Sequence, residues 1–95
     1  MKRGYIYILT TKYNTVFYTG VTSNLPERIH EHKTDVGSKF TRKYKIKKLI
    51  WFDEYPTIRD AIDAEKRIKK WKRRWKEEMI EELNPDYSDL YEEIL

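Results

Sequence analysis

Two tyrosines, one arginine and one glutamate stand at intervals that could assemble a site for phosphodiester hydrolysis. Tyr7 and Tyr18 lie in two short aromatic segments, Arg28 follows the second segment, and Glu65 comes much later. A guanidinium is a planar, permanently charged partner for phosphate oxygens, and a phenol can relay a proton if its phenolate is stabilised. A carboxylate can hold a cation that stabilises a leaving oxygen. These residue types suffice for breaking a phosphodiester bond if the fold brings them together.

The tyrosines belong to a predicted β-hairpin. Residues 4–10 (GYIYILT) and 15–21 (TVFYTGV) are rich in β-branched and aromatic side chains, and the polar residues 11–14 separate them. Residues 22–24 then offer helix-capping oxygens, and Pro26 suits a first helical turn, which predicts a short helix over residues 25–33. That helix carries Arg28 and His32. Taken alone, a packed hairpin and a solvated helix face explain the same residues.

The middle of the chain is expected to contain a mobile loop, a third strand and the start of a second helix. Residues 34–48 include six Lys and Arg and few bulky apolar side chains, which predicts a mobile basic loop. Residues 49–55 (LIWFDEY) resemble a strand that Pro56 closes. Thr57, with Asp60 three residues later, predicts a helix start in the manner of a capping box.

Glu65 lies within the apolar stripe of this second helix. The stripe has helical spacing and should face the sheet. Its apolar members are Ile58, Ala61, Ile62, Ala64 and Ile68. A carboxylate on a covered face is costly unless it has a partner or a metal ion. A functional carboxylate is the favoured interpretation, and the structural alternatives are a buried Glu65–Arg28 ion pair or a glutamate that reaches water at the stripe's margin.

A further helical segment follows with no Gly or Pro between. Its apolar side chains recur every three or four residues, at Trp75, Met79, Ile80 and Leu83. One bent helix or two fit this pattern, and a break within residues 71–74 is favoured because a straight helix could not return both apolar faces to so small a core. Asn84 precedes a proline and should end the segment. Residues 86–95 should form a short acidic helix or a frayed tail.

Charge is divided unevenly along the chain. All 20 Lys and Arg lie in residues 1–76 with 8 of the Asp and Glu, whereas residues 77–95 hold the other 8 acidic residues and no basic one. Residues 66–76 are the most basic stretch, interrupted only by Ile68, Trp71 and Trp75. Unbroken like charge is costly unless something neutralises it, so either a nucleic acid or the acidic segment 77–95 is expected to do so. The tryptophans could contact nucleic acid or pack inward.

Length and composition bound the remaining possibilities. The 95 residues fit one domain, expected to span residues 1–95, and the absence of cysteine excludes disulfides, thiolate metal sites and cysteine nucleophiles. The start of the chain has no cleavage signal, and no apolar run approaches about 18 residues. We therefore expect a cytoplasmic protein that is neither secreted nor membrane-spanning.

The ordered set of residues resembles the GIY-YIG nuclease domain. The matching features are Tyr5-Ile6-Tyr7, Tyr18-Thr19-Gly20, Arg28 eight residues past the glycine, His32 one turn further, Glu65 on a later helix and Asn84. Each tyrosine motif alone is common, whereas the set covers nearly the whole chain. The chain is most similar to the small stand-alone bacterial members, related to the N-terminal nuclease module of the excinuclease of nucleotide excision repair. Segments 18–33 and 40–42 are typical of these members.

The resemblance implies an α+β fold in which helices flank a small three-stranded antiparallel sheet. It also implies that Tyr7 and Tyr18 are the catalytic tyrosines, that Arg28 contacts the scissile phosphate, and that Glu65 binds one divalent cation, Mg²⁺ or Mn²⁺. His32 matches a position that is histidine in some members, which makes it a further catalytic candidate.

Two other positions should support the site, and two depart from the family pattern. By the resemblance, Gly20 is the motif glycine and Asn84 helps to hold the site together. Tyr5 and Thr19 differ from the motif, but both catalytic tyrosines are kept. In a strand Thr19 points away from the face that Tyr18 and Gly20 share, so it should alter packing more than chemistry.

These residues and the resemblance predict a metal-dependent DNA endonuclease that works in DNA repair or recombination, with branched, flapped or damaged DNA as the expected substrate. The alternatives are a nucleic-acid-binding module with a vestigial site and a protein-interaction domain that recruits a partner through segment 77–95. The oligomeric state stays open. The residues expected to contact DNA are Lys39, Arg42, Lys43, Lys69, Lys70, Arg73 and Arg74.

Overall fold

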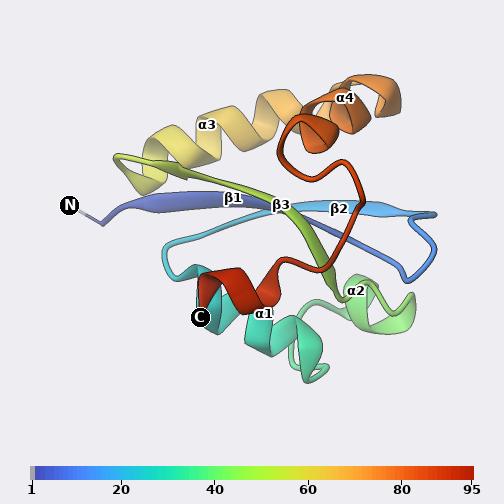
Figure 1. Cartoon of the computed structure of the whole chain (residues 1–95). Helices are drawn as coiled ribbons and strands as arrows, with labels where there is room; N and C mark the ends of the chain where they lie inside the picture. Colours follow the sequence, from blue (N-terminus) through green and yellow to red (C-terminus); the bar gives the residue numbers. More distant parts are fainter. Residues whose placement is uncertain (1) are drawn as a thin grey trace.

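A computed structural model of the chain describes residues 2–95 and has an α+β fold built on one antiparallel sheet (Figure 1). The elements in chain order are β1 (Gly4–Thr10), β2 (Phe17–Thr22), α1 (Leu25–Lys33), α2 (Lys39–Lys43), β3 (Lys48–Tyr55), α3 (Ile58–Lys69), α4 (Arg73–Leu83) and the 3₁₀ helix η1 (Tyr91–Ile94). The strands lie in the order β2-β1-β3, so β1 is central. Helices α3 and α4 cover one face of the sheet, and α1, α2 and η1 cover the other (Figure 1). The predicted three-stranded antiparallel sheet flanked by helices is confirmed.

Strands β1 and β2 form the predicted hairpin, with Tyr7 opposite Gly20 and Leu9 opposite Tyr18. Successive side chains in a strand point to opposite faces. Ile6 therefore packs in the core beneath α3, whereas Tyr7 packs in the core beneath α1. Each face of the sheet has its own hydrophobic core.

Helix α1 has the predicted bounds, and the Asn24 side chain caps it by accepting from the Glu27 amide. Its buried Leu25 and Ile29 pack beside Tyr7, which fixes the helix against the hairpin. The next segment is not the mobile loop that we predicted. Residues 39–43 form the short helix α2, capped by the Ser38 side chain.

Strand β3 pairs with β1, and α3 follows with Thr57 as its cap. Residues 70–72 separate α3 from α4, so the predicted break near residues 71–74 is present and two helices form. The stripe on α3 is narrower than expected, because Ile62 is 36% exposed. Trp71 packs partly against the core, whereas Trp75 is 52% exposed.

Residues 86–95 fold back onto the α1 side of the sheet. Leu90 is buried in the core beside Tyr7, and its amide donates to the Leu49 carbonyl at 2.8 Å. The 3₁₀ helix η1 follows, close to α1 (Figure 1). Of the two expected forms, the segment therefore adopts a short helix. Among residues 2–95, no helix is both long enough and apolar enough to cross a bilayer.

Candidate active site

Tyr7, Arg28 and His32 converge on one point beneath the sheet. The Tyr7 hydroxyl lies 3.0 Å from His32 Nε2, and Arg28 Nε donates to the same oxygen at 3.4 Å. The side chains come from the middle of β1 and from two positions one turn apart on α1. Tyr7 and His32 are 1% and 2% exposed. The structure therefore brings together three of the predicted catalytic residues.

The contacts of Thr41 indicate which ring nitrogen of His32 carries the proton. The Thr41 hydroxyl donates to the Ser38 carbonyl at 3.1 Å and lies 3.1 Å from His32 Nδ1. Because that hydroxyl proton is already used, the contact is best satisfied if Nδ1–H donates to Thr41. His32 Nε2 is then an acceptor, and the Tyr7 hydroxyl donates to it. A chain of hydrogen bonds therefore runs from α2 through His32 to Tyr7.

Burial sets the charge state of this pair. It raises the pKa of Tyr7 to about 12, although the hydrogen bond from Arg28 acts in the opposite direction. Burial also lowers the pKa of His32 to about 4, and the charge of Arg28 adds to this effect. Near neutral pH the phenol keeps its proton and the imidazole is uncharged. The site thus holds an uncharged acid–base pair beside one permanent positive charge.

Arg28 is the member of the site that reaches solvent. Its side chain is 31% exposed, and Nη1 pairs with Glu31 Oε1 at 2.9 Å. The hydrogen bond from Arg28 to Glu31 raises the pKa of Arg28, with a further contribution from Tyr7, so the guanidinium stays charged. A charged, partly exposed guanidinium held beside a buried phenol can bind an anion in contact with that phenol.

Gly20 allows the Tyr7 ring to lie across strand β2. A Cβ atom on Gly20 would come within 2.4 Å of the Tyr7 hydroxyl oxygen. The Tyr7 hydroxyl therefore sits over β2, which is an edge strand of the sheet. Gly37 has the same relation to His32, because a Cβ there would lie 2.5 Å from Nδ1. Both glycines are explained by the close approach of a site side chain.

Tyr18 contributes its ring to an aromatic cluster around the site. Its centroid lies 6.4 Å from that of Tyr7 and 5.7 Å from that of His32. On its other side it stacks with Phe40 of α2 at 6.4 Å. Thr19 is buried on the opposite face of the sheet, as the alternation along the strand predicts.

Glu65 belongs to the other layer. It is 9% exposed, and its Oε2 lies 3.2 Å from Lys69 Nζ. Among residues 2–95 it forms no ion pair with Arg28 and no hydrogen bond with Tyr7. Ala64 and Arg67 face β3, where they line a hollow, so Glu65 lies on the flank of α3 turned toward β2. The carboxylate therefore lies on the opposite face of the sheet from Tyr7.

Asn84 lies away from these side chains and ties the C-terminal segment to the sheet. It is buried, its Nδ2 donates to the Ile50 carbonyl at 3.1 Å and to the Ser88 carbonyl at 2.8 Å, and its Oδ1 accepts from the Ser88 amide at 3.2 Å. This bonding gives Asn84 a structural role at the end of α4.

The basic residues predicted to contact DNA divide into two groups. Lys39, Arg42 and Lys43 are exposed on α2, next to the aromatic cluster of the site. The others lie in or beside the break between α3 and α4, in the opposite layer. Of these, Lys69, Arg73 and Arg74 pair with Glu65, Glu77 and Glu78, and Lys70 ends α3.

Arg73 also has a structural role. Its guanidinium donates to the Thr15 carbonyl at 3.0 Å and lies 3.9 Å from the centre of the Phe17 ring. These contacts, together with a donation to the Asn14 carbonyl, hold α4 against the hairpin loop. The acidic helix α4 thus neutralises part of the basic stretch 66–76, which was one of the two expected outcomes.

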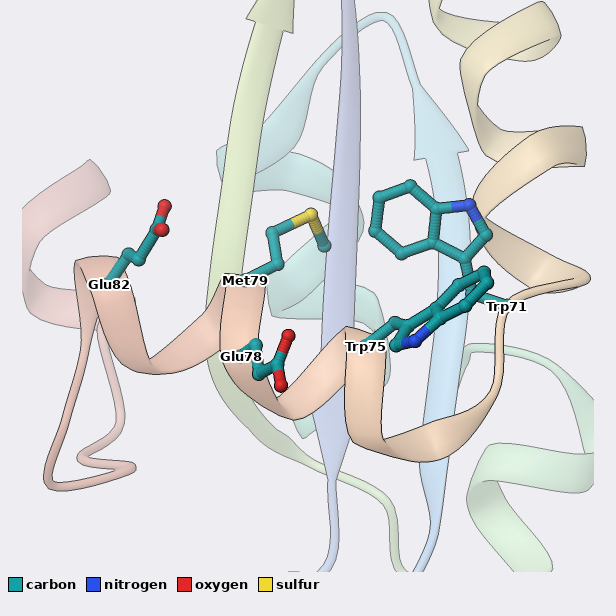
Figure 2. Close-up of a pocket in the computed structure, with 5 residues that line it drawn as sticks. All are labelled: Trp71, Trp75, Glu78, Met79 and Glu82. Atoms are coloured by element: carbon teal, nitrogen blue, oxygen red, sulfur yellow. The ribbon is translucent and has the colours of Figure 1, made fainter.

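A hollow on the α3–α4 side has a different chemical character. Trp71 and Trp75 line it together with Met79, and the carboxylates of Glu78 and Glu82 lie at its rim (Figure 2). Its acidic rim is unfavourable for phosphate.

Sequence reasoning missed Ser38, Gly37 and Thr41 as parts of the site. They lie in the stretch that was predicted to be a loop. The available signal was the Ser-x-x-Thr spacing of Ser38 and Thr41, which is typical of a helix cap.

Comparison with known proteins identifies the relatives of this chain. The family model described as the GIY-YIG catalytic domain matches residues 3–78. A UPF0213 protein of Limosilactobacillus reuteri is 41% identical over 78 residues, which cover 80% of each chain. A UPF0213 protein of Clostridium perfringens is 40% identical over 76 residues, covering 80% of this chain and 81% of the relative. The solution NMR structure of a UPF0213 protein from Bacillus halodurans superposes with a TM-score of 0.58 and 30% identity over 92% of each chain.

Proposed function

The chain belongs to the GIY-YIG family of nucleases, and we propose that it is a metal-dependent endonuclease that hydrolyses phosphodiester bonds in DNA. One observation carries this proposal: the Tyr7 hydroxyl contacts both a neutral histidine and a charged, partly exposed arginine. A phenol with a base on one side and an anion-binding group on the other is suited to phosphoryl chemistry. A role in DNA repair or recombination is part of the proposal.

Tyr7 and His32 supply the proton path. A water that attacks phosphorus forms the new P–O bond and gives one proton to the Tyr7 oxygen. Tyr7 passes its own proton to His32 Nε2, and the bond to the leaving oxygen breaks, with solvent protonating that oxygen. General-base transfer of this kind contributes about 10²–10⁴ in rate.

Arg28 couples substrate binding to this proton path. Its charge opposes protonation of His32. A phosphate bound at the guanidinium offsets that repulsion, so His32 becomes a better proton acceptor when substrate is present. The same contact stabilises the negative charge that accumulates on the phosphate oxygens.

The residues present can supply one carboxylate to a cation that keeps water among its ligands. They do not supply the several ligands of a site formed by protein side chains alone. Among residues 2–95, no three His, Asp or Glu side chains gather into a metal site. Glu65 offers a single largely buried carboxylate, and Mg²⁺ or Mn²⁺ often uses one or two carboxylates together with water and substrate phosphate. Glu65 would hold the ion in place of its contact with Lys69. When bound, such an ion acts as a Lewis acid toward the leaving oxygen.

The edge strand β2 explains how both layers could serve one phosphate. Tyr7 reaches over β2 from one face because Gly20 has no side chain, and Glu65 lies on the flank of α3 turned toward the same strand. A phosphate at this edge meets Arg28 from one side of the sheet and Glu65 from the other.

Nicking of DNA tests the proposal. Purified protein with MgCl₂ or MnCl₂ should nick a fluorescently labelled branched or single-stranded oligonucleotide, and EDTA should stop the reaction. Glu65→Ala should abolish nicking while binding in EDTA stays within about threefold, because the carboxylate serves the cation and not the strand. Equal nicking by the variant would remove the metal role of Glu65.

A second candidate function is binding of nucleic acid without cleavage. The observation in its favour is that the Glu65 carboxylate pairs with Lys69 and contacts neither Tyr7 nor Arg28. The same assay separates the two. Binding with no metal-dependent nicking of branched, flapped or single-stranded DNA would establish the binding module.

A further inference from the structure

Five lysines surround one hollow on the α1–α2 side of the sheet. They come from the hairpin loop, the end of α1 and the connection from α2 to β3. We call this feature the lysine hollow. Its lining residues are Lys12, Lys33, Lys45, Lys47, Lys48 and Asp89. None of these lysines was among the residues that the sequence predicted to contact DNA.

Carboxylates neutralise only part of this charge. Lys33 pairs with Asp89, and Lys47 pairs with Asp35 at 2.9 Å. The structure records no ion pair within residues 2–95 for Lys12, Lys45 or Lys48. Three positive charges therefore remain uncompensated around one hollow. Such a concentration of like charge costs free energy unless an anion binds there.

The hollow is preformed by packed segments. Lys33 Nζ donates to the Lys47 carbonyl at 3.0 Å, which joins the end of α1 to the approach to β3. Ile46, which lies between Lys45 and Lys47 in the chain, is fully buried. Lys48 Nζ donates to the Lys12 carbonyl at 3.4 Å, which holds the hairpin loop against β3. Because these contacts fix the backbone, little ordering is left to oppose ligand binding.

The hollow lies at a defined distance from the candidate active site. Lys48 is opposite Thr10 in the β1–β3 ladder, three residues along β1 from Tyr7. Three strand residues span about 10 Å. The hairpin loop, α2 and the start of β3 also lie at this end of the sheet (Figure 1).

We propose that the lysine hollow binds backbone phosphates of a nucleic-acid strand that flank the phosphate held at Arg28. Lysine ammonium groups bind phosphate as point charges and read no sequence. The hollow therefore sets the register and direction of the strand across the site. The position relative to Arg28 rests on the proposed function, whereas the phosphate-binding character of the hollow stands on its own charge.

Salt dependence of binding tests the hollow without cleavage. The probe is a fluorescein-labelled single-stranded 20-mer, titrated in EDTA by fluorescence anisotropy at several NaCl concentrations. The variant is Lys12→Gln/Lys45→Gln/Lys48→Gln. Each lost phosphate contact should lower the slope of log K against log salt by about 0.7, so the triple variant should lose about two units of slope and about tenfold or more in affinity at 100 mM NaCl.

A matched control removes the same charge elsewhere. Lys2→Gln/Arg3→Gln/Arg59→Gln neutralises three exposed side chains near the start of β1 and α3, at the other end of the sheet. It should change the slope by less than about one unit. An equal loss in both variants would show that only net charge matters and would overturn the proposal, as would an unchanged hollow variant.

Two further measurements complete the test. One distinguishes free polyphosphate from a nucleic-acid strand as the ligand of the hollow, and the other distinguishes failure of the hollow from failure of the proposed function. If sodium tripolyphosphate displaces the 20-mer from wild type at concentrations no higher than an equal charge of a competing oligonucleotide, the hollow is a site for free polyphosphate and the assignment to a strand is wrong. Nicking is measured on the same proteins. Loss of binding by the hollow variant, with no nicking by wild type, would defeat the proposed function and leave the hollow standing.

Discussion

The two layers around the sheet differ in what their charged side chains contact. In the layer of α1 and α2, Arg28 contacts Tyr7, and three lysines of the lysine hollow have no carboxylate partner within residues 2–95. In the layer of α3 and α4, Lys66, Arg67, Lys70, Lys72 and Lys76 form no ion pair within residues 2–95, whereas three other basic side chains meet glutamates one helical turn away. These pairs are Lys69–Glu65, Arg73–Glu77 and Arg74–Glu78.

The difference shows that charge density along a chain does not measure the charge available to a ligand. Residues 66–76 are the most basic stretch, yet the helical spacing of α4 supplies glutamates at i+4. The lysines of the hollow are dispersed in the sequence, and the fold gathers five of them with carboxylate partners for only two.

The largest expected difference between the layers concerns two tyrosines. Tyr7→Phe removes the hydroxyl that contacts His32 and Arg28 and should lower the nicking rate by about 10³, because the proton path is lost. Tyr87→Phe removes a hydroxyl that donates to Glu81 on α4 and should stay within about twofold of wild type, because that bond is exposed. Single-turnover nicking measures both. Similar losses in the two variants would contradict the division of roles.

The next difference lies in the acid stability of the α1–α2 side. The folded pKa of His32 is about 4, below the unfolded value near 6.5, so its neutral form stabilises the fold fully above pH 6.5 and progressively less as the pH falls toward 4. The groups facing the ring are the Tyr7 hydroxyl, the Arg28 guanidinium and the Thr41 hydroxyl, with Glu31 acting more weakly. Wild type should lose roughly 3 kcal/mol of unfolding free energy over this window through His32 alone.

Urea unfolding of wild type and His32→Gln at pH 7 and pH 4 isolates the contribution of His32 to the pH dependence of the unfolding free energy. Carboxylates titrate in both proteins, so they cancel in the difference. The variant should lose less stability on acidification. Parallel losses in the two proteins would mean that His32 does not remain neutral in the fold.

The smallest expected effect is on the basic stretch of the α3–α4 side. Arg74→Gln removes an exposed partner of Glu78 and should change unfolding free energy by less than about 1 kcal/mol. Its effect on the salt slope of oligonucleotide binding should be below about one unit, because Glu78 already pairs with Arg74. Anisotropy titrations against NaCl would measure it. A slope change as large as that of the hollow variant would reverse the comparison of the two layers.

The sequence predicted those parts of the fold that depend on local signals. The β-branched runs predicted the hairpin, and the Asn24 and Pro26 signals predicted α1 with the observed bounds. Helix α2 was missed because a short, highly charged segment has no apolar stripe. It is held by Ser38 at its cap and by the buried Thr41. Such support comes from tertiary contacts, which periodicity does not report.

The candidate site also has parts that local signals predicted and parts that depend on tertiary contacts. Helical spacing placed Arg28 and His32 one turn apart on α1, and the alternation along β2 separated Thr19 from the face of Tyr18. The burial of Glu65 also followed from the stripe on α3. The layer in which Glu65 lies could not be predicted, because periodicity says that a face is covered without saying by which face of the sheet. The lysine hollow could not be predicted either, because its lysines are far apart in the sequence and only the fold brings them together.

The return of the C-terminal segment has a consequence for synthesis on the ribosome. Leu90 fills the core beside Tyr7, and Asp89 accepts from the Leu49 amide and pairs with Lys33. Nascent chains that end before these residues therefore lack part of the core that supports Tyr7 and α1, although the hairpin and α1 have already been made. The α1 layer can mature only after Leu90 has emerged, so an unfinished chain carries the residues of the candidate site without the means to hold them in place.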